Sequence, residues 1–245
     1  MTTDKTIIKV KPKAVFSLVE EMFPNDNIDV ISTLPPTGIG SLLTLECAVI
    51  CAILRIVNPK TIFEIGTFNG SSALLFARNT EDGTKVVTLD LPPDEIEIDQ
   101  NKNLDILNGF ENDDYLKREF KNKGAYYIDR APEEAKKKIV QVLQNSLAFD
   151  PIQLGLEGSQ ELVFIDGGHD YETIKNDTEK SMIMCKRNSV ILWHDYGSNI
   201  HVDVEKYLKE KAQNQQIFSV AHTMLAISFQ GDLADIQSEI VNFNG

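Results

Sequence analysis

Cysteine is scarce in this chain of 245 residues, which contains only Cys47, Cys51 and Cys185. An odd number of thiols and no leader peptide exclude a disulfide scaffold and predict a reduced, cytoplasmic protein. A zinc finger is also excluded, because Cys47 and Cys51 lie in an apolar run and Cys185 has no Cys or His partner at finger-like spacing.

The chain also lacks a long hydrophobic run and an excess of basic residues. Its longest apolar run, Leu42–Val57, is interrupted by Glu46 and Arg55, whereas a membrane span needs about 20 apolar residues. We therefore predict a buried helix there and no membrane association. The chain has 24 Lys and Arg against 37 Asp and Glu, a net charge of −13. This balance argues against binding to nucleic acid through phosphate neutralisation.

Short apolar segments rich in β-branched residues alternate with helix-length stretches. This alternation predicts an α/β domain, with a parallel sheet that is covered by helices on both faces. Near the C-terminus, the runs 216–220 and 223–229 leave no room for a helix between them and predict an antiparallel hairpin at a sheet edge. The parallel strands are predicted at Thr61–Ile65, Lys85–Leu89, Ala125–Ile128, Glu161–Ile165 and Ser189–Trp193.

No repeat, low-complexity tract or Gly/Ser linker divides the chain, so we predict one domain. Residues 1–57 are expected to decorate it with helical or irregular structure, including a turn at 34–38, and residues 58–245 to form its main body. Within the main body, 92–122 is a long acidic insertion. The stretch 90–119 holds ten acidic and three basic residues. A solvated insertion is the simplest interpretation, and a lid over the ligand site is the alternative.

The strand predicted at Thr61–Ile65 runs into a glycine-containing turn and a helix of small residues. Gly66 lets a ligand approach the backbone, Gly70 lets the helix pack closely, and free N–H groups at the helix start can bind an anion. Asp90, 24 residues after Gly66, ends the next strand, where an acid can accept hydrogen bonds from ribose hydroxyls. The pair predicts a nucleoside ligand, without the Gly-x-Gly-x-x-Gly spacing that seats a dinucleotide.

The segment Glu64-Ile65-Gly66-Thr67-Phe68-Asn69-Gly70-Ser71-Ser72 resembles the first motif of class I S-adenosylmethionine-dependent methyltransferases. It is most similar to the small-molecule O-methyltransferases related to catechol and caffeoyl-CoA enzymes. The segments Leu162–Tyr171 and Val190–Tyr196 resemble later motifs of that branch, in its methyltransferase family 24 subset. The resemblance implies a Rossmann-like, mostly parallel seven-stranded sheet with an antiparallel last strand.

This resemblance implies S-adenosyl-L-methionine as cofactor, with Asp90 on its ribose. Asp129 and Arg130 follow the third predicted strand and fall where family members contact adenine. Each assignment has a structural alternative: Glu64 caps or pairs locally, Ser72 is a helix N-terminal residue, and Arg130 is a surface charge. The other residues expected at the cofactor are those of the first motif and one from a later motif, namely Glu64, Gly66, Thr67, Phe68, Gly70, Ser71, Ser72 and Asp166.

Polar side chains follow the fourth and fifth predicted strands, at the edge where open parallel sheets bind ligands. Asp166 and His169 follow the fourth strand, and His194 and Asp195 follow the fifth. Carboxylates at neighbouring strand ends can share one ion, and metal-dependent family members bind it with acids at these positions. The resemblance therefore allows a divalent metal (Mg, Mn or Fe) on Asp166, His194 and Asp195, with the imidazole favouring Mn or Fe.

The reaction implied is attack by a substrate hydroxyl on the sulfonium methyl group, assisted by a metal or a base. His169 and His194 are the candidate bases, because imidazole titrates near neutral pH, and Asp166 joins them as a catalytic residue. Alternatively, His169 fixes the turn at 167–168 and His194 packs beside Trp193.

Two other functions stay open. A nicotinamide-dependent oxidoreductase shares the strand–turn–helix and the ribose acid, and a catalytically silent binding module would keep the pocket without turnover. We expect a small-molecule acceptor, whose identity the sequence does not specify. The resemblance also allows a homodimer, because members of the family commonly form one. The remaining histidines, His201 and His222, are not accompanied by acids at strand ends and are interpreted as surface or hairpin residues.

Overall fold

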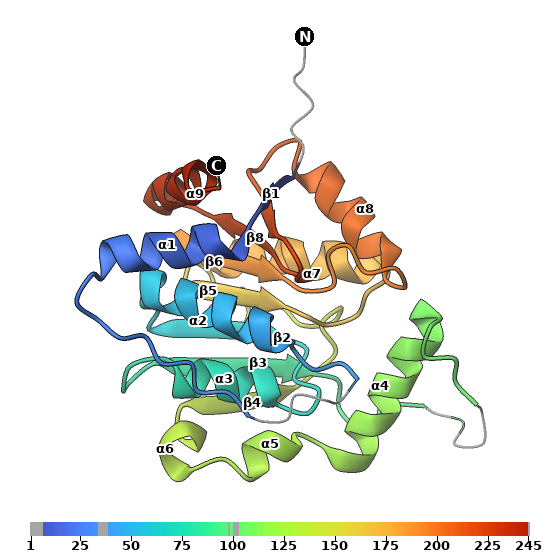
Figure 1. Ribbon diagram of the computed structural model, residues 1–245. Helices are drawn as coiled ribbons and strands as arrows, with labels where there is room; N and C mark the ends of the chain where they lie inside the picture. Colours follow the sequence, from blue (N-terminus) through green and yellow to red (C-terminus); the bar gives the residue numbers. More distant parts are fainter. Residues whose placement is uncertain (1–6, 34–38, 98, 100–102, 245) are drawn as a thin grey trace.

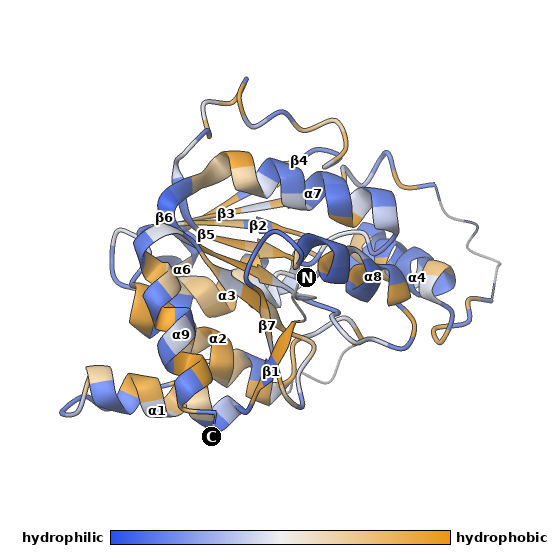
Figure 2. Ribbon diagram, turned by 90° about the horizontal axis from the view of Figure 1, so that it is seen from above, coloured by the Kyte–Doolittle hydropathy of each residue, from blue (hydrophilic) through white to orange (hydrophobic). Residues whose placement is uncertain are grey.

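The computed structural model describes residues 7–33, 39–97, 99 and 103–244, so the turn predicted at 34–38 lies outside the described residues. The described chain folds as one sheet with helices on both faces (Figures 1 and 2), which confirms the predicted α/β architecture. The strands are β1 (Ile8–Val10), β2 (Thr61–Ile65), β3 (Lys85–Asp90), β4 (Ile139–Leu143), β5 (Gln160–Ile165), β6 (Cys185–Trp193), β7 (Phe218–Val220) and β8 (Ala226–Phe229).

The helices include the buried one predicted around Leu42–Val57 and the small-residue helix after the first glycine turn. They are α1 (Pro12–Met22), α2 (Thr44–Val57), α3 (Ser71–Arg78), α4 (Gly109–Lys123), α5 (Tyr126–Asp129), α6 (Glu133–Lys136), α7 (Tyr171–Met184), α8 (Val202–Lys211), the 3-10 helix η1 (Gly231–Leu233) and α9 (Ala234–Asn242).

The strand order is β1-β7-β8-β6-β5-β2-β3-β4. The run from β6 to β4 is parallel, and β8 is antiparallel to both of its neighbours. The antiparallel last strand is therefore confirmed. The sheet has an eighth strand, because β1 pairs in parallel with β7. The β7–β8 hairpin accordingly lies inside the sheet, and the prediction of an edge position was wrong. A three-residue strand in a lysine-rich segment has too little alternation to be recognised.

The prediction of a strand at Ala125–Ile128 was also wrong. Those residues belong to α5 and its start, and the third strand of the parallel run is β4, in which Val140 pairs with Val87 of β3. Short apolar runs do not distinguish strand from helix by periodicity. Here the segment packs beside the start of α3, where the N–H of Tyr127 donates to the carbonyl oxygen of Asn69 at 2.9 Å.

Side chains of the central strands alternate between two hydrophobic cores. Ile62 and Phe164 face the core that contains α1, α2 and α3. Phe63 and Ile165 face the core that contains α7 and α8. In Figure 2 the apolar strands lie between these two helical layers. Because both faces are covered, a ligand can reach the parallel strands only at their ends.

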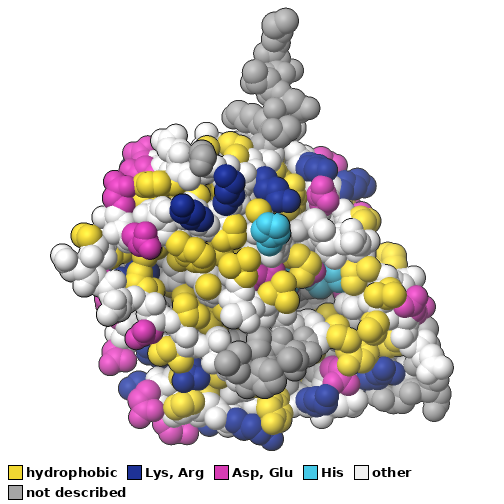
Figure 3. Space-filling view, viewed as in Figure 1, with side chains coloured by type: hydrophobic (Ala, Val, Ile, Leu, Met, Phe, Trp, Pro, Cys, Tyr) yellow, Lys and Arg dark blue, Asp and Glu magenta, His cyan; other side chains and the backbone are white. Residues whose placement is uncertain are grey.

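Some apolar side chains are exposed at the surface, Met22, Val30 and Leu43 among them. On the face seen in Figure 3, apolar side chains gather over α1 and α2. Apolar atoms contribute a large share of the surface of any folded protein. Among the described residues, no helix combines the length and the apolar character needed to cross a bilayer.

Gly66 brings three strand ends together. It has a φ of +102°, and a Cβ at this position would overlap the carbonyl oxygen of Asp166. Its N–H donates to Leu89 at 2.8 Å, and the N–H of Asp166 donates to Ile65 at 2.8 Å. The glycine is therefore required for the protein backbone itself to close up at the ends of β2, β3 and β5.

Replacing Gly66 by Ala should lower the free energy of unfolding by about 3 kcal/mol or more, because positive φ and backbone overlap act together. Gly83→Ala is the matched control, since Gly83 has a φ of +91° but nothing within 4 Å of a Cβ. The control should lose only about 1 kcal/mol. Urea unfolding of both variants measures the difference, and equal losses would contradict the close backbone contact at Gly66.

Candidate functional site

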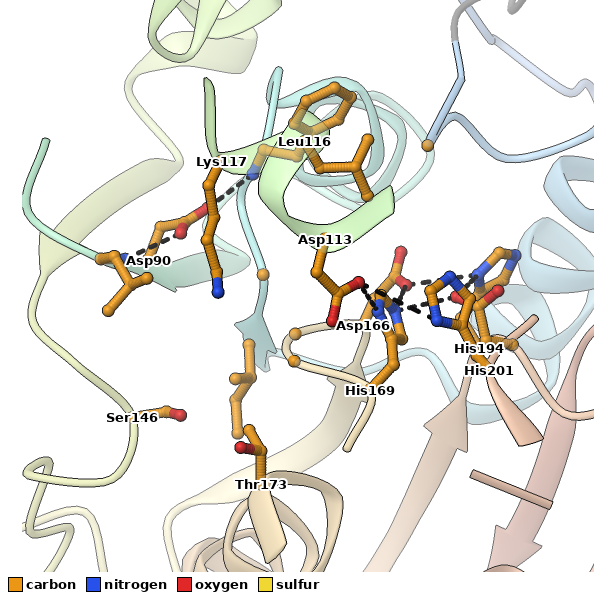
Figure 4. Close-up of a pocket in the computed structure, with 18 of the residues that line it drawn as sticks. Asp90, Asp113, Leu116, Lys117, Ser146, Asp166, His169, Thr173, His194 and His201 are labelled. Atoms are coloured by element: carbon orange, nitrogen blue, oxygen red, sulfur yellow. Dashed lines mark hydrogen bonds and ion pairs between the residues drawn. The ribbon is translucent and has the colours of Figure 1, made fainter. Parts of the chain in front are cut away.

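A cavity of about 410 Å³ opens at the carboxyl ends of the parallel strands. Its walls come from the loops after β2, β3, β4, β5 and β6 and from one face of α4. Figure 4 shows Asp90 at one end of this cavity, a cluster of Asp166, His169, His194 and His201 at the other, and the Lys117 side chain between them. The position is the one at which open parallel sheets bind ligands.

Asp90 ends β3 and lies against the turn after β2. One of its carboxylate oxygens accepts the N–H of Phe68 at 2.7 Å, and the other accepts the N–H of Leu91 at 2.7 Å. Burial raises the pKa of Asp90, although these N–H donors oppose the shift. Gly66, Phe68, Asp90 and Asp166 all line the cavity, so the structure brings together four residues predicted to hold the cofactor.

Glu64 lies behind the turn and does not line the cavity. Its carboxylate accepts the hydroxyl of Thr88 at 2.5 Å and also bonds to Ser72, while the hydroxyls of Thr67 and Thr88 are 2.7 Å apart. Burial raises the pKa of Glu64 to about 8, against the opposing effect of the Ser72 and Thr88 hydrogen bonds. Glu64, Thr67 and Ser72 therefore form hydrogen bonds within the fold and support the turn from the side away from the cavity.

The structure places the remaining predicted cofactor residues outside the cavity lining. Gly70 and Ser71 begin α3. Asp129 and Arg130 are exposed at the end of α5, and the Arg130 guanidinium lies 3.8 Å from the centre of the Tyr126 ring. Their assignment to adenine depended on the misplaced third strand. The residues that follow the actual strand β4 are Gln144, Asn145, Ser146 and Leu147, and these four line the cavity.

The three predicted metal ligands converge at the other end of the cavity. Nδ1 of His194 lies 3.2 Å from Oδ1 of Asp166 and 3.0 Å from Oδ2 of Asp195. Its Nε2 lies 3.3 Å from Oε2 of Glu46. Asp195 has a φ of +59°, an unfavourable conformation for a non-glycine residue, of a kind that clusters at functional sites.

Acidic groups flank both nitrogens of His194. Burial alone would lower the pKa of His194, but Asp166 and Asp195 outweigh it and raise the pKa well above its ordinary value. Burial alone would raise the pKa of Asp195, but His194 and His169 lower it well below its ordinary value. The flanking carboxylates therefore favour the protonated imidazole, which donates from both nitrogens.

His169 approaches the same two carboxylates, and a third acid lies on its other nitrogen. Its Nδ1 lies 2.7 Å from Oδ1 of Asp113, whereas its Nε2 lies 3.0 Å from Oδ2 of Asp195 and 3.9 Å from Oδ1 of Asp166. Burial alone would lower the pKa of His169, but its contacts with Asp113, Asp166 and Asp195 outweigh it and raise the pKa well above its ordinary value. Asp166, His169 and Asp195 each offer a ligand atom, all within 4.8 Å of one another. This nitrogen-and-oxygen donor set fits a divalent transition metal.

The family model described as a methyltransferase domain, for methyltransferase family 24, matches residues 63–196, which is more than half of the chain. The chain belongs to this family. The matched segment begins in β2, ends just after β6, and so contains Asp90, Asp166, His169 and Asp195. No curated protein sequence matches this methyltransferase.

Solved structures that are similar to this methyltransferase are distant in sequence. The O-methyltransferase TomG from Streptomyces achromogenes is 15% identical, with 89% of this chain and 90% of TomG covered and a TM-score of 0.48. The Podospora anserina methyltransferase PaMTH1 is 16% identical, with coverages of 91% and 89% and a TM-score of 0.46. An O-methyltransferase from Bacillus cereus is 14% identical, with coverages of 89% and 90% and a TM-score of 0.47.

Three residues of the methyltransferase site carry little signal in the sequence. His201, predicted at the surface, is buried, and its ring centre lies 3.9 Å from that of His169. Asp113 lies in the insertion that was interpreted as solvated. Glu46 is fully buried, and its Oε1 accepts the N–H of Met224 at 2.8 Å. An acid inside an apolar run was the one available clue, because a buried carboxylate needs a partner. The other remaining histidine, at position 222, is exposed in the β7–β8 turn as predicted.

One face of α4 forms a wall of the cavity. The α4 residues that line the cavity recur at helical spacing, and the other side of the helix faces away from the cavity. The insertion is therefore more than a solvated loop, and in Figure 1 its helix stands beyond the carboxyl ends of the strands. The lining residues of α4 are Asn112, Asp113, Leu116, Lys117 and Phe120.

The raised pKa of Glu64 makes stability depend on pH. Its pKa rises from an ordinary 4.5 to about 8 on folding, so the unfolded chain loses this proton first and the folded state loses stability between these values. Glu64→Gln removes the ionisation. The variant should melt at a higher temperature than the wild type at about pH 9 and show a smaller difference at about pH 5.

Thermal unfolding at the two pH values checks this expectation. Glu239→Gln is the control, because Glu239 is an exposed carboxylate on α9. The control should shift the melting temperature equally at both pH values. An equal effect of Glu64→Gln at both would mean that Glu64 is charged in the folded protein throughout this range.

Proposed function

We propose that this methyltransferase transfers a methyl group from S-adenosylmethionine to a hydroxyl oxygen of a small molecule. The observation that carries the proposal is one cavity that joins the ribose acid Asp90 to the cluster of His169, Asp166 and Asp195. Family membership supports the methyl transfer, and the cluster at the strand ends supports a hydroxyl acceptor, because a hydroxyl is a poor nucleophile until it is deprotonated.

The residues of the cavity divide the work between its two ends. Asp90 accepts hydrogen bonds from the ribose of the cofactor, and the loop 144–147 contacts its adenine ring. When bound, the cofactor supplies an electrophilic methyl group on a sulfonium, which an aligned oxygen can attack. More acidic than basic side chains line the cavity, and their negative charge attracts the positively charged sulfonium.

Asp166, His169 and Asp195 would hold a divalent metal. When bound, such an ion supplies positive charge that favours the deprotonated acceptor oxygen. In its absence, Nε2 of His169 can accept the hydroxyl proton only in the neutral form of the ring, and the flanking carboxylates raise the pKa above which that form prevails. His194 keeps the two carboxylates close by neutralising them.

The acceptor proposed is a small molecule with an apolar body. Apolar side chains of the cavity support this assignment, namely Ile39, Leu116, Ile200 and Met224. Asp113 is the one acidic side chain that the described part of the insertion adds to the lining. We retain a cytoplasmic location and a homodimer in the proposal; the three free thiols suit a reducing compartment.

Asp90→Ala should weaken binding of S-adenosylhomocysteine by about 1.5–3 kcal/mol, because two ribose hydroxyls lose a charged acceptor. Asp82→Ala is the control, since that side chain is 94% exposed and lies outside the cavity. Isothermal titration calorimetry measures both variants. Unchanged affinity in folded Asp90→Ala would remove Asp90 from the site, and tighter binding of NAD than of S-adenosylhomocysteine would favour an oxidoreductase.

Chelation should lower methyl transfer from labelled S-adenosylmethionine while leaving the binding of S-adenosylhomocysteine intact. Asp195→Ala should reproduce the loss, because it removes one of the proposed ligands. Mn²⁺ or Fe²⁺ should restore activity better than Mg²⁺, since the set includes an imidazole. Full activity of metal-free protein in chelator would leave His169 as a metal-independent base. No transfer to any hydroxyl compound, despite tight cofactor binding, would indicate a silent binding module.

A further inference from the structure

We propose that Asp113 of α4 is a positioning residue for His169, so that the acidic insertion completes the reaction centre. The inference rests on the proposed function only in placing Nε2 of His169 at that centre. The insertion lies outside the strands and glycine turn that build the rest of the cavity, and Asp113 is 56 residues from His169 in the chain.

The contact between the two side chains is direct and shielded from solvent. Oδ1 of Asp113 lies 2.7 Å from Nδ1 of His169, and the two side chains are only 17% and 9% exposed. A carboxylate at Nδ1 holds the proton on that nitrogen and fixes the orientation of the ring. The other nitrogen, Nε2, is then turned towards Asp166 and Asp195, which is the direction needed to share a metal ion with their carboxylates.

His201 restricts the same imidazole from another side. Its ring is tilted by 33° to that of His169, with the two centres 3.9 Å apart. Nδ1 of His201 also lies 3.9 Å from Oδ1 of Asp113. Rotation of the His169 ring would therefore break the Asp113 contact and collide with a buried neighbour.

The start of α4 is fixed on the loop that carries His201. A Cβ at Gly109 would overlap the carbonyl oxygen of Ile200, so the helix backbone touches that loop directly. Asp113 follows Gly109 by four residues and lies on the same helix face. Between them, Asn112 donates to the carbonyl oxygen of Ile106 at 2.9 Å and closes the loop that leads into the helix. The anchored turn thus places the Asp113 carboxylate over His169.

The test measures Mn²⁺ binding by calorimetry in the presence of S-adenosylhomocysteine. Asp113→Ala should weaken Mn²⁺ binding by about 10- to 100-fold, the usual effect of removing a carboxylate behind a ligating histidine. S-adenosylhomocysteine affinity should stay within about twofold, because Asp113 does not touch Asp90 or the glycine turn. Asp114→Ala removes the same charge from the next residue, which does not line the cavity, and should leave both affinities unchanged.

Two results of this titration would overturn the proposal. One is unchanged Mn²⁺ affinity in Asp113→Ala. The other is a parallel loss of Mn²⁺ and S-adenosylhomocysteine binding in that variant, which would make Asp113 a general support of the fold. Weak S-adenosylhomocysteine binding by the wild type would instead contradict the proposed function, so the two failures are distinguishable.

Proton NMR gives a readout that needs no metal. A proton held between Nδ1 of His169 and the Asp113 carboxylate should give a far-downfield resonance in the wild type and in Asp114→Ala. The resonance should disappear in both Asp113→Ala and His169→Gln. If the wild type binds no Mn²⁺, this pattern still supports the positioning role. A resonance that persists in Asp113→Ala, or that is missing from the wild type, would contradict it.

Discussion

The repulsion between Asp166 and Asp195 is the constraint on which the rest of the site depends. Asp166 follows β5 and Asp195 follows β6, and these neighbouring parallel strands lie about 4.8 Å apart. Their carboxylates are therefore held close together. Two buried negative charges at this distance require protons or a cation between them. His194 and His169 supply the imidazoles that face both carboxylates, and each imidazole has a further acid on its other nitrogen.

These outer acids connect the site to distant parts of the fold. Glu46 approaches His194 from the start of α2 and also holds the β7–β8 turn through Met224. Asp113 approaches His169 from α4. Removing one partner from a buried charged network costs about 3–5 kcal/mol, because the remaining charge is left uncompensated. A change in the position of α2 or α4 would therefore also move the imidazoles of the reaction centre.

Much of the fold was predictable because its signals are local. The strand and glycine turn around Gly66 and the acid at Asp90 follow from patterns within about thirty residues, and the meeting of Asp166 with Asp195 follows from parallel pairing. The third strand was misplaced because two short apolar segments compete for it and only tertiary packing decides. Glu46 was missed because its contact with His194 spans 148 residues, and no local pattern records such a contact.

The most direct test of this account is a crystal structure of the protein with S-adenosylhomocysteine and Mn²⁺. We predict that the ribose of the nucleoside lies on Asp90 and that the ion lies on Asp166, Asp195 and Nε2 of His169. His194 should lie between these carboxylates and Glu46. A nucleoside bound away from the carboxyl ends of β2 and β3, or a His169 ring turned with Nε2 away from both acids, would contradict it.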